Sequence, residues 1–128
     1  MWHGIYRRWN PIPEFEGKRL YIEAVHDDWE GMRVWLKSEN SEDGMIVLRF
    51  QGVEAYFSSD ESNRLRPIEP EQFLNFPHAF WKVENSELFE NLNSQSCGTS
   101  PTGVQHFAIL ACEDCIDILA ESVSTNYE

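Results

Sequence analysis

Apolar and polar residues begin to alternate after Arg19, and this alternation is the clearest pattern in the 128-residue chain. In 20–26 the side chains at 20, 22 and 24 fall on one face, and in 32–37 those at 32, 34 and 36 do the same. A period of two is typical of half-buried strands. The polar segment 27–31 ends in a glycine and predicts a turn, so we expect the two segments to form a hairpin.

Further extended segments follow along the chain. Residues 45–50 are too apolar for an edge and predict a central strand, and 53–57 and 79–83 are also expected to be extended. One short helix is predicted over 86–93, because Ser86 can cap it and acidic residues lie in its first turn.

The segment from 105 to 122 fits two interpretations. Its apolar residues line one face of a helix over 106–122, but they also fit two strands, 105–111 and 115–120, with a polar break at Glu113 and Asp114. We favour the two strands.

These elements predict one domain over 1–128 of class α+β, mainly antiparallel β-sheet with one short helix. Residues 1–17 are expected to form an N-terminal arm whose aromatic side chains pack on the sheet. The expected core consists of Leu20, Ile22, Val34, Leu36, Ile46, Leu48, Phe50, Trp81, Leu88, Phe107, Ile109, Ile116 and Ile118.

Charge narrows the possible partners. The chain has 10 Lys and Arg against 22 Asp and Glu, for a formal net charge of -12. Its overall field repels nucleic acids and anionic membranes, so we expect a basic protein partner and neither of the other two. No secretory or membrane-spanning segment is visible, and the chain is expected to be cytoplasmic.

Candidate catalytic and metal sites are weak. Cys112 and Cys115 have C-x-x-C spacing, but a zinc site needs four ligands and the two intervening acidic residues disfavour a reactive thiolate. We expect structural cysteines that flank a turn. The remaining catalytic candidates are His26 beside two aspartates, which falls in a predicted turn where solvated charge is ordinary, and Cys97 with His106, which lacks a third orienting residue. We therefore expect no metal, no cofactor and no enzyme activity.

Exposed aromatic residues beside acidic ones are the better candidates for function. Trp29 lies among Asp27, Asp28 and Glu30 in the predicted turn, and Tyr56 precedes Asp60 and Glu61. Tryptophan and tyrosine are frequent anchors in protein interfaces, and carboxylates around them attract Lys and Arg. These seven residues are the predicted partner-binding set; the alternative is that Trp29 and Tyr56 only pack over the sheet.

Three stretches within 45–122 also resemble a known class of protein. They are 47–50 leading through Tyr56 to 60–62, then 81–88, and then 106–109 with 114–119. Together they resemble the small, acidic, sheet-rich bacterial immunity proteins that accompany polymorphic toxins. The resemblance implies an antiparallel sheet and a protein–protein role. It transfers no functional residue, because such proteins bind their toxins through different surfaces.

The function expected from the sequence is therefore binding. We expect an immunity protein that neutralises a basic, nuclease-like toxin by covering its active cleft. The alternatives are a small enzyme and a structural or oligomeric protein without a toxin partner. The sequence leaves the oligomeric state open.

Overall fold

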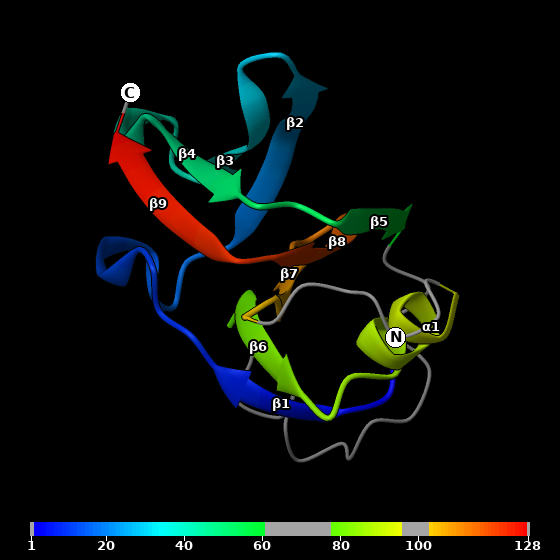
Figure 1. Cartoon of the computed structure of the whole chain (residues 1–128). Coiled ribbons are helices and arrows are strands. Elements are labelled where there is room, and N and C mark those ends of the chain that lie inside the picture. The colour runs from blue at the N-terminus through cyan, green and yellow to red at the C-terminus, as the bar shows by residue number, and fades with distance from the viewer. Residues whose placement is uncertain (1, 61–77, 96–102, 128) are drawn as a thin grey trace.

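Two antiparallel sheets pack face to face and form the body of the protein (Figure 1). The computed structural model describes residues 2–60, 78–95 and 103–127, and these ranges hold nine strands and one α-helix. The five-stranded sheet, in spatial order, contains β1 (Ile5–Arg8), β6 (Phe80–Glu84), β7 (Gln105–Leu110), β8 (Asp114–Ala120) and β5 (Ala55–Asp60). The four-stranded sheet contains β2 (Leu20–Asp28), β3 (Gly31–Ser38), β4 (Met45–Gln51) and β9 (Ser122–Tyr127). The predicted fold class is confirmed.

The main core lies between the two sheets. Inward-facing side chains of β3 and β4 meet those of β6, β7 and β8, together with Ile12 and Phe15 from the N-terminal segment. The Phe107 ring is 1% exposed, and its centroid lies 5.0 Å from that of Trp9 and 5.5 Å from that of Phe50. Aromatic packing thus joins the arm and both sheets.

The predicted core is largely correct, with three differences. Ile22 and Leu88 are only half-buried, and Ile22 packs against the edge of the main core. No residue of the helix α1 (Glu87–Gln95) is fully buried, because the helix lies on the outer face of the five-stranded sheet. Trp81 is buried in a second apolar cluster, away from the main core, with Tyr6 and Val83 among its members.

Two adjacent bends connect the sheets. After β4 the chain turns at Gly52 and continues as β5, and after β8 it turns at Glu121 and continues as β9. The Glu121 N–H donates to the Gln51 carbonyl at 2.9 Å, so the two bends are bonded to each other. Gly52 has a φ of 64°, and a Cβ there would lie 2.6 Å from the Glu121 side chain. Glycine is therefore required at this corner.

The hairpin β2–β3 is longer than predicted and contains a bulge. The strands extend to the Asp28–Gly31 pair, which leaves only Trp29 and Glu30 in the turn. The register shifts between Ile22 and Ala24, so positions 20, 22 and 24 do not share one face as expected. A bulge adds one residue to one strand and inverts the alternation that follows it.

The two-strand interpretation of the terminal segment is confirmed by β7 and β8, and the helical alternative is wrong. The predicted cap of α1 is also present, because the Ser86 Oγ accepts the Phe89 N–H at 3.0 Å. Two strands were not predicted. The strand β1 lies within the N-terminal arm and pairs with β6, and the strand β9 pairs with β4.

A candidate binding hairpin and groove

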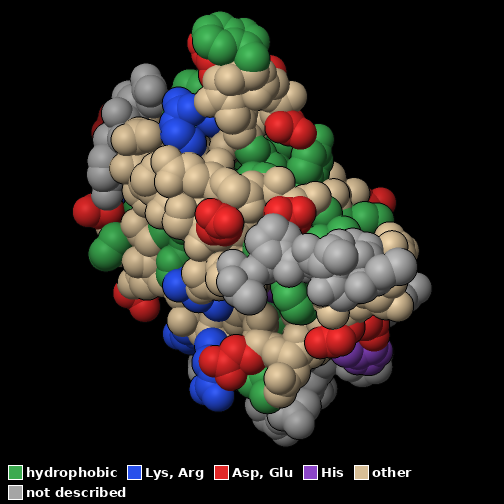
Figure 2. All heavy atoms as spheres, in the orientation of Figure 1, with side chains coloured by type: hydrophobic (Ala, Val, Ile, Leu, Met, Phe, Trp, Pro, Cys, Tyr) green, Lys and Arg blue, Asp and Glu red, His purple; other side chains and the backbone are tan. Residues whose placement is uncertain are grey.

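Trp29 stands at the tip of the β2–β3 hairpin with its side chain in solvent. It is 92% exposed, whereas the other large hydrophobic residues described as exposed lie between 37% and 47%. Figure 2 shows hydrophobic atoms at this end of the molecule, over the hairpin tip, with acidic side chains beside them. Trp29 therefore does not pack over the sheet, which was the alternative to a binding role.

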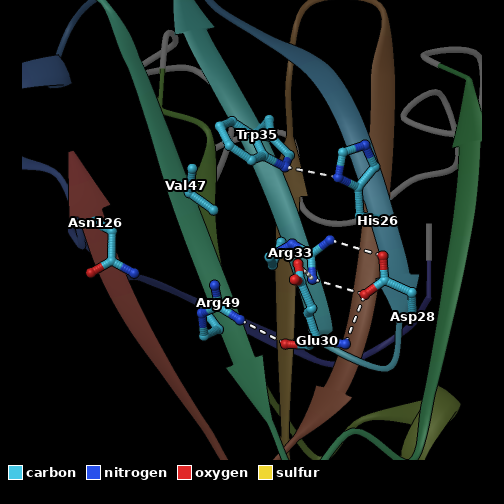
Figure 3. Close-up of a pocket in the computed structure, with 8 residues that line it drawn as sticks. All are labelled: His26, Asp28, Glu30, Arg33, Trp35, Val47, Arg49 and Asn126. Carbon is cyan, nitrogen blue, oxygen red and sulfur yellow. Dashed lines mark hydrogen bonds and ion pairs between the residues drawn. The ribbon is translucent and has the colours of Figure 1, made fainter. Parts of the chain in front are cut away.

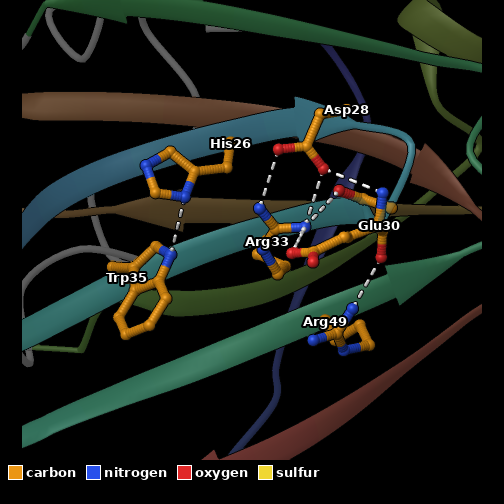
Figure 4. Close-up of polar contacts among 7 residues, drawn as sticks. His26, Asp28, Glu30, Arg33, Trp35 and Arg49 are labelled. Carbon is orange, nitrogen blue, oxygen red and sulfur yellow. Dashed lines mark hydrogen bonds and ion pairs between the residues drawn. The ribbon is translucent and has the colours of Figure 1, made fainter.

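Hydrogen bonds from Asp28 and Arg33 hold the turn beneath Trp29 (Figure 4). The Asp28 Oδ1 accepts the Glu30 N–H at 2.9 Å, an arrangement in which an aspartate side chain replaces a backbone turn bond. Arg33 donates from Nη1 to Oδ1 at 2.9 Å and from Nη2 to Oδ2 at 3.0 Å. This two-point bond holds the pKa of the Asp28 carboxyl below its ordinary value and raises the pKa of Arg33.

The pairing changes which carboxylates are available to a partner. Asp28 gives both oxygens to Arg33, and the Glu30 Oε2 lies 3.6 Å from the Arg33 Nη1. The Arg33 side chain is only 6% exposed, so this charge is compensated inside the hairpin. Asp27 is exposed and forms no ion pair within the described part of the chain. It is thus the predicted acidic residue of the turn whose charge is most available.

Arg49 supports the turn from the neighbouring strand. It lies directly across from Arg33 on β4, and its Nη1 donates to the Glu30 carbonyl at 2.7 Å. Both backbone polar groups of Glu30 are therefore bonded: Asp28 accepts its N–H and Arg49 donates to its carbonyl. These bonds pre-organise the turn that presents Trp29.

An open groove of about 450 Å³ lies beside the turn on the outer face of the four-stranded sheet (Figure 3). All four strands contribute to it. Its lining consists of His26, Asp28, Glu30, Arg33, Trp35, Val47, Arg49 and Asn126. Two of the predicted hairpin acids, Asp28 and Glu30, thus border a groove that contains two arginines, which the sequence analysis did not single out as site residues.

His26, a catalytic candidate from the sequence, takes part in this groove through Trp35. The Trp35 Nε1 donates to the His26 Nδ1 at 3.2 Å, so this ring nitrogen is an acceptor. Asp28 is bonded to Arg33, and alternation along β2 places Asp27 on the opposite face from His26. The three residues therefore do not converge on one reacting atom.

The second predicted part of the binding set lies on another sheet. Tyr56 and Asp60 are on β5, an edge strand of the five-stranded sheet, and both are exposed. The Phe57 ring packs edge-on against Trp2 with centroids 5.6 Å apart. Glu61 lies outside the described residues. The hairpin belongs to the four-stranded sheet and β5 to the five-stranded sheet, so the two parts of the predicted binding set do not lie on neighbouring strands of one sheet.

A buried polar network escaped the sequence analysis. The Ser86 Oγ lies 2.6 Å from the His106 Nδ1, and the His106 Nε2 lies 2.7 Å from the Asp117 Oδ1. All three residues are at most 6% exposed. In the neutral imidazole, Nε2–H donates to the carboxylate and Nδ1 accepts the serine hydroxyl, while the serine oxygen also caps α1. The network connects α1 to β7 and β8.

Ser86 in this network is better placed as a structural group than as a nucleophile, because its oxygen is buried and already accepts the Phe89 N–H. Of the pair expected from the sequence, His106 belongs to this buried network and Cys97 lies outside the described residues. Three separate segments supply Ser86, His106 and Asp117, and no short motif in the sequence marks them.

Cys112 and Cys115 flank the turn between β7 and β8, and neither forms a disulfide within the described part of the chain. Among the described residues, no group of three or more His, Cys, Asp or Glu side chains has the arrangement of a metal site. Likewise, no helix in the described ranges is long and apolar enough to cross a membrane.

Comparison of the chain with protein-family models, curated proteins and solved structures finds no match.

Proposed function

We propose that the protein is a protein-binding module of the immunity type, which docks the tip of the β2–β3 hairpin on a basic, nuclease-like toxin and covers its active cleft. The observation that carries this proposal is the Trp29 side chain, which is 92% exposed on a hydrogen-bonded turn. Exposure of this large apolar side chain to water is unfavourable, and burial in a partner would recover that free energy.

The rigid turn favours binding for an entropic reason. A loop that must be ordered on association loses conformational entropy, and this loss lowers affinity. The bonds from Asp28 and Arg49 hold the Glu30 backbone before any partner arrives. A large aromatic side chain on a pre-organised turn has the character of an interface hot spot.

Charge supports a basic partner. The chain carries a net charge of -12, and the exposed Asp27 stands next to Trp29 without an ion pair among the described residues. Long-range attraction of this kind increases the association rate, while the contacts of Trp29 once it is buried in the complex determine the dissociation rate.

The proposal is tested by surface-binding kinetics against the product of the adjacent gene, at low and at physiological salt. We expect Trp29→Ala to cost about 2 kcal/mol or more, mainly by faster dissociation. Asp27→Lys is expected to slow association, and more so at low salt. Glu42→Lys makes the same charge change on an exposed residue between β3 and β4 and is the matched control.

Two results would contradict the proposal. One is the absence of binding to the adjacent gene product. The other is binding whose rates are the same for Trp29→Ala and the wild type, because the hairpin would then lie outside the interface.

A further inference from the structure

Arg49 differs from the other cations on the outer face of the four-stranded sheet. Arg33 is paired with Asp28, and the Lys37 Nζ lies 2.8 Å from the Glu23 Oε2. Within the described residues Arg49 forms no ion pair, and its Nη1 donates a hydrogen bond to the neutral Glu30 carbonyl. The guanidinium has five N–H donors, so most of them remain for a ligand.

The groove places this guanidinium where a ligand can reach it. Arg49 is half-buried, and Figure 3 shows it between the turn and Asn126, with Trp35 further along the same groove. Val47, which is 2% exposed, belongs to the same lining. The groove therefore combines one guanidinium that has no ion pair among the described residues with an amide and an aromatic side chain.

The surrounding charges select the kind of anion. Asp28 and Glu30 line the same groove, and the whole chain is strongly acidic, so a dianion or a polyanion would be repelled. A single carboxylate matches the one guanidinium that has no ion pair, and its planar oxygens fit this group in two parallel hydrogen bonds.

We propose that the groove binds a carboxylate side chain, Asp or Glu, of the partner protein, with Arg49 as the residue that holds it. This inference rests on the proposed function, because the groove beside the turn that carries Trp29 would then accept an acidic residue from the toxin. Trp29 and Arg49 would form two neighbouring anchors of one interface.

The first experiment needs no partner. Propionate, which carries the single carboxylate of a glutamate side chain, is titrated into the labelled protein at constant ionic strength, and NMR signals of the Arg49 Nε–H, the Trp35 Nε1–H and the Asn126 amide are followed. We expect saturable shifts that sodium chloride does not reproduce, and weaker binding of inorganic phosphate. Non-saturating shifts that match those in chloride would overturn the inference.

Variants separate charge from geometry. Arg49→Gln is expected to abolish the saturable shifts, and Arg49→Lys to weaken binding because it keeps the charge but loses the two-point bond. Lys37→Gln removes a cation that is already paired on the same sheet and is the matched control. The Arg33 Nε signal reports whether the turn keeps its structure in each variant.

The second experiment measures the variants against the adjacent gene product. We expect Arg49→Gln to increase the dissociation rate about tenfold or more. If Trp29→Ala weakens binding while Arg49→Gln does not, the inference fails and the proposed function stands. If neither variant has an effect, the proposed function fails, and the propionate titration alone decides whether the groove binds carboxylates.

Discussion

Replacing Ser86 by alanine should destabilise the protein by about 2–4 kcal/mol, although the residue is a single small serine. Its Oγ caps α1 through the Phe89 N–H, and loss of such a cap costs about 1 kcal/mol. The same Oγ is the partner of the buried His106 Nδ1, and an unpaired buried polar atom costs about 1–3 kcal/mol. The two hydrogen bonds of this hydroxyl go to different partners, so we expect the two losses to add.

A second substitution separates the two contributions. Glycine at a helix N-cap costs only a few tenths of a kcal/mol, so Ser86→Gly retains most of the cap but still leaves His106 unpaired. We therefore expect Ser86→Gly to cost about 1–3 kcal/mol, less than Ser86→Ala. Ser58→Ala, at an exposed position of β5, is the control and should change stability by less than about 0.5 kcal/mol.

The assay is urea unfolding followed by tryptophan fluorescence, with the free energy extrapolated to water. If Ser86→Gly is as stable as the wild type, His106 does not depend on the serine and the network does not stabilise the fold. If Ser86→Ala is also within about 0.5 kcal/mol of the wild type, the cap is equally unimportant and the reasoning is refuted.

Three further predictions concern the hairpin, the arm and the core. The bond to Arg33 lowers the pKa of Asp28 below 3.8, so the stabilisation from this bond is complete above pH 3.8 and is lost as the pH falls through the lower pKa of the folded state. In urea unfolding, the stability of Asp28→Asn should therefore fall less on acidification than that of the wild type. Identical pH profiles for the two proteins would contradict this. Burial, reinforced by the charge of Asp117, raises the pKa of Tyr6 above its ordinary 10.0, so the fold should lose stability above pH 10, and Tyr6→Phe should flatten that loss in alkaline unfolding curves. Phe107→Ala should cost about 3–5 kcal/mol in thermal or urea unfolding, whereas a similar cost for the exposed Phe57→Ala would mean that the core is placed wrongly.

The strands with a strong period of two were predictable from the sequence. In β3 the apolar side chains alternate with polar ones, and in β7 and β8 a polar turn separates two apolar runs. Such patterns indicate directly whether one or both faces of a strand are buried. The strands β1 and β9 were not predicted, because 122–127 is mostly polar and becomes a strand only by pairing with β4. That pairing is a contact between distant parts of the chain.

The candidate site divides in the same way. The sequence determined that Trp29 lies in an acidic turn between two strands, because both the turn residues and the alternation are local features. It also determined the net charge, from which a basic partner was predicted. Tertiary structure alone decided that Asp28 is paired with Arg33 and that Arg49 has no ion pair among the described residues, because the register between strands sets which charges meet. For the same reason only the folded chain brings Ser86, His106 and Asp117 together, since hydrogen bonds between distant segments exist only after the sheet and the helix have packed.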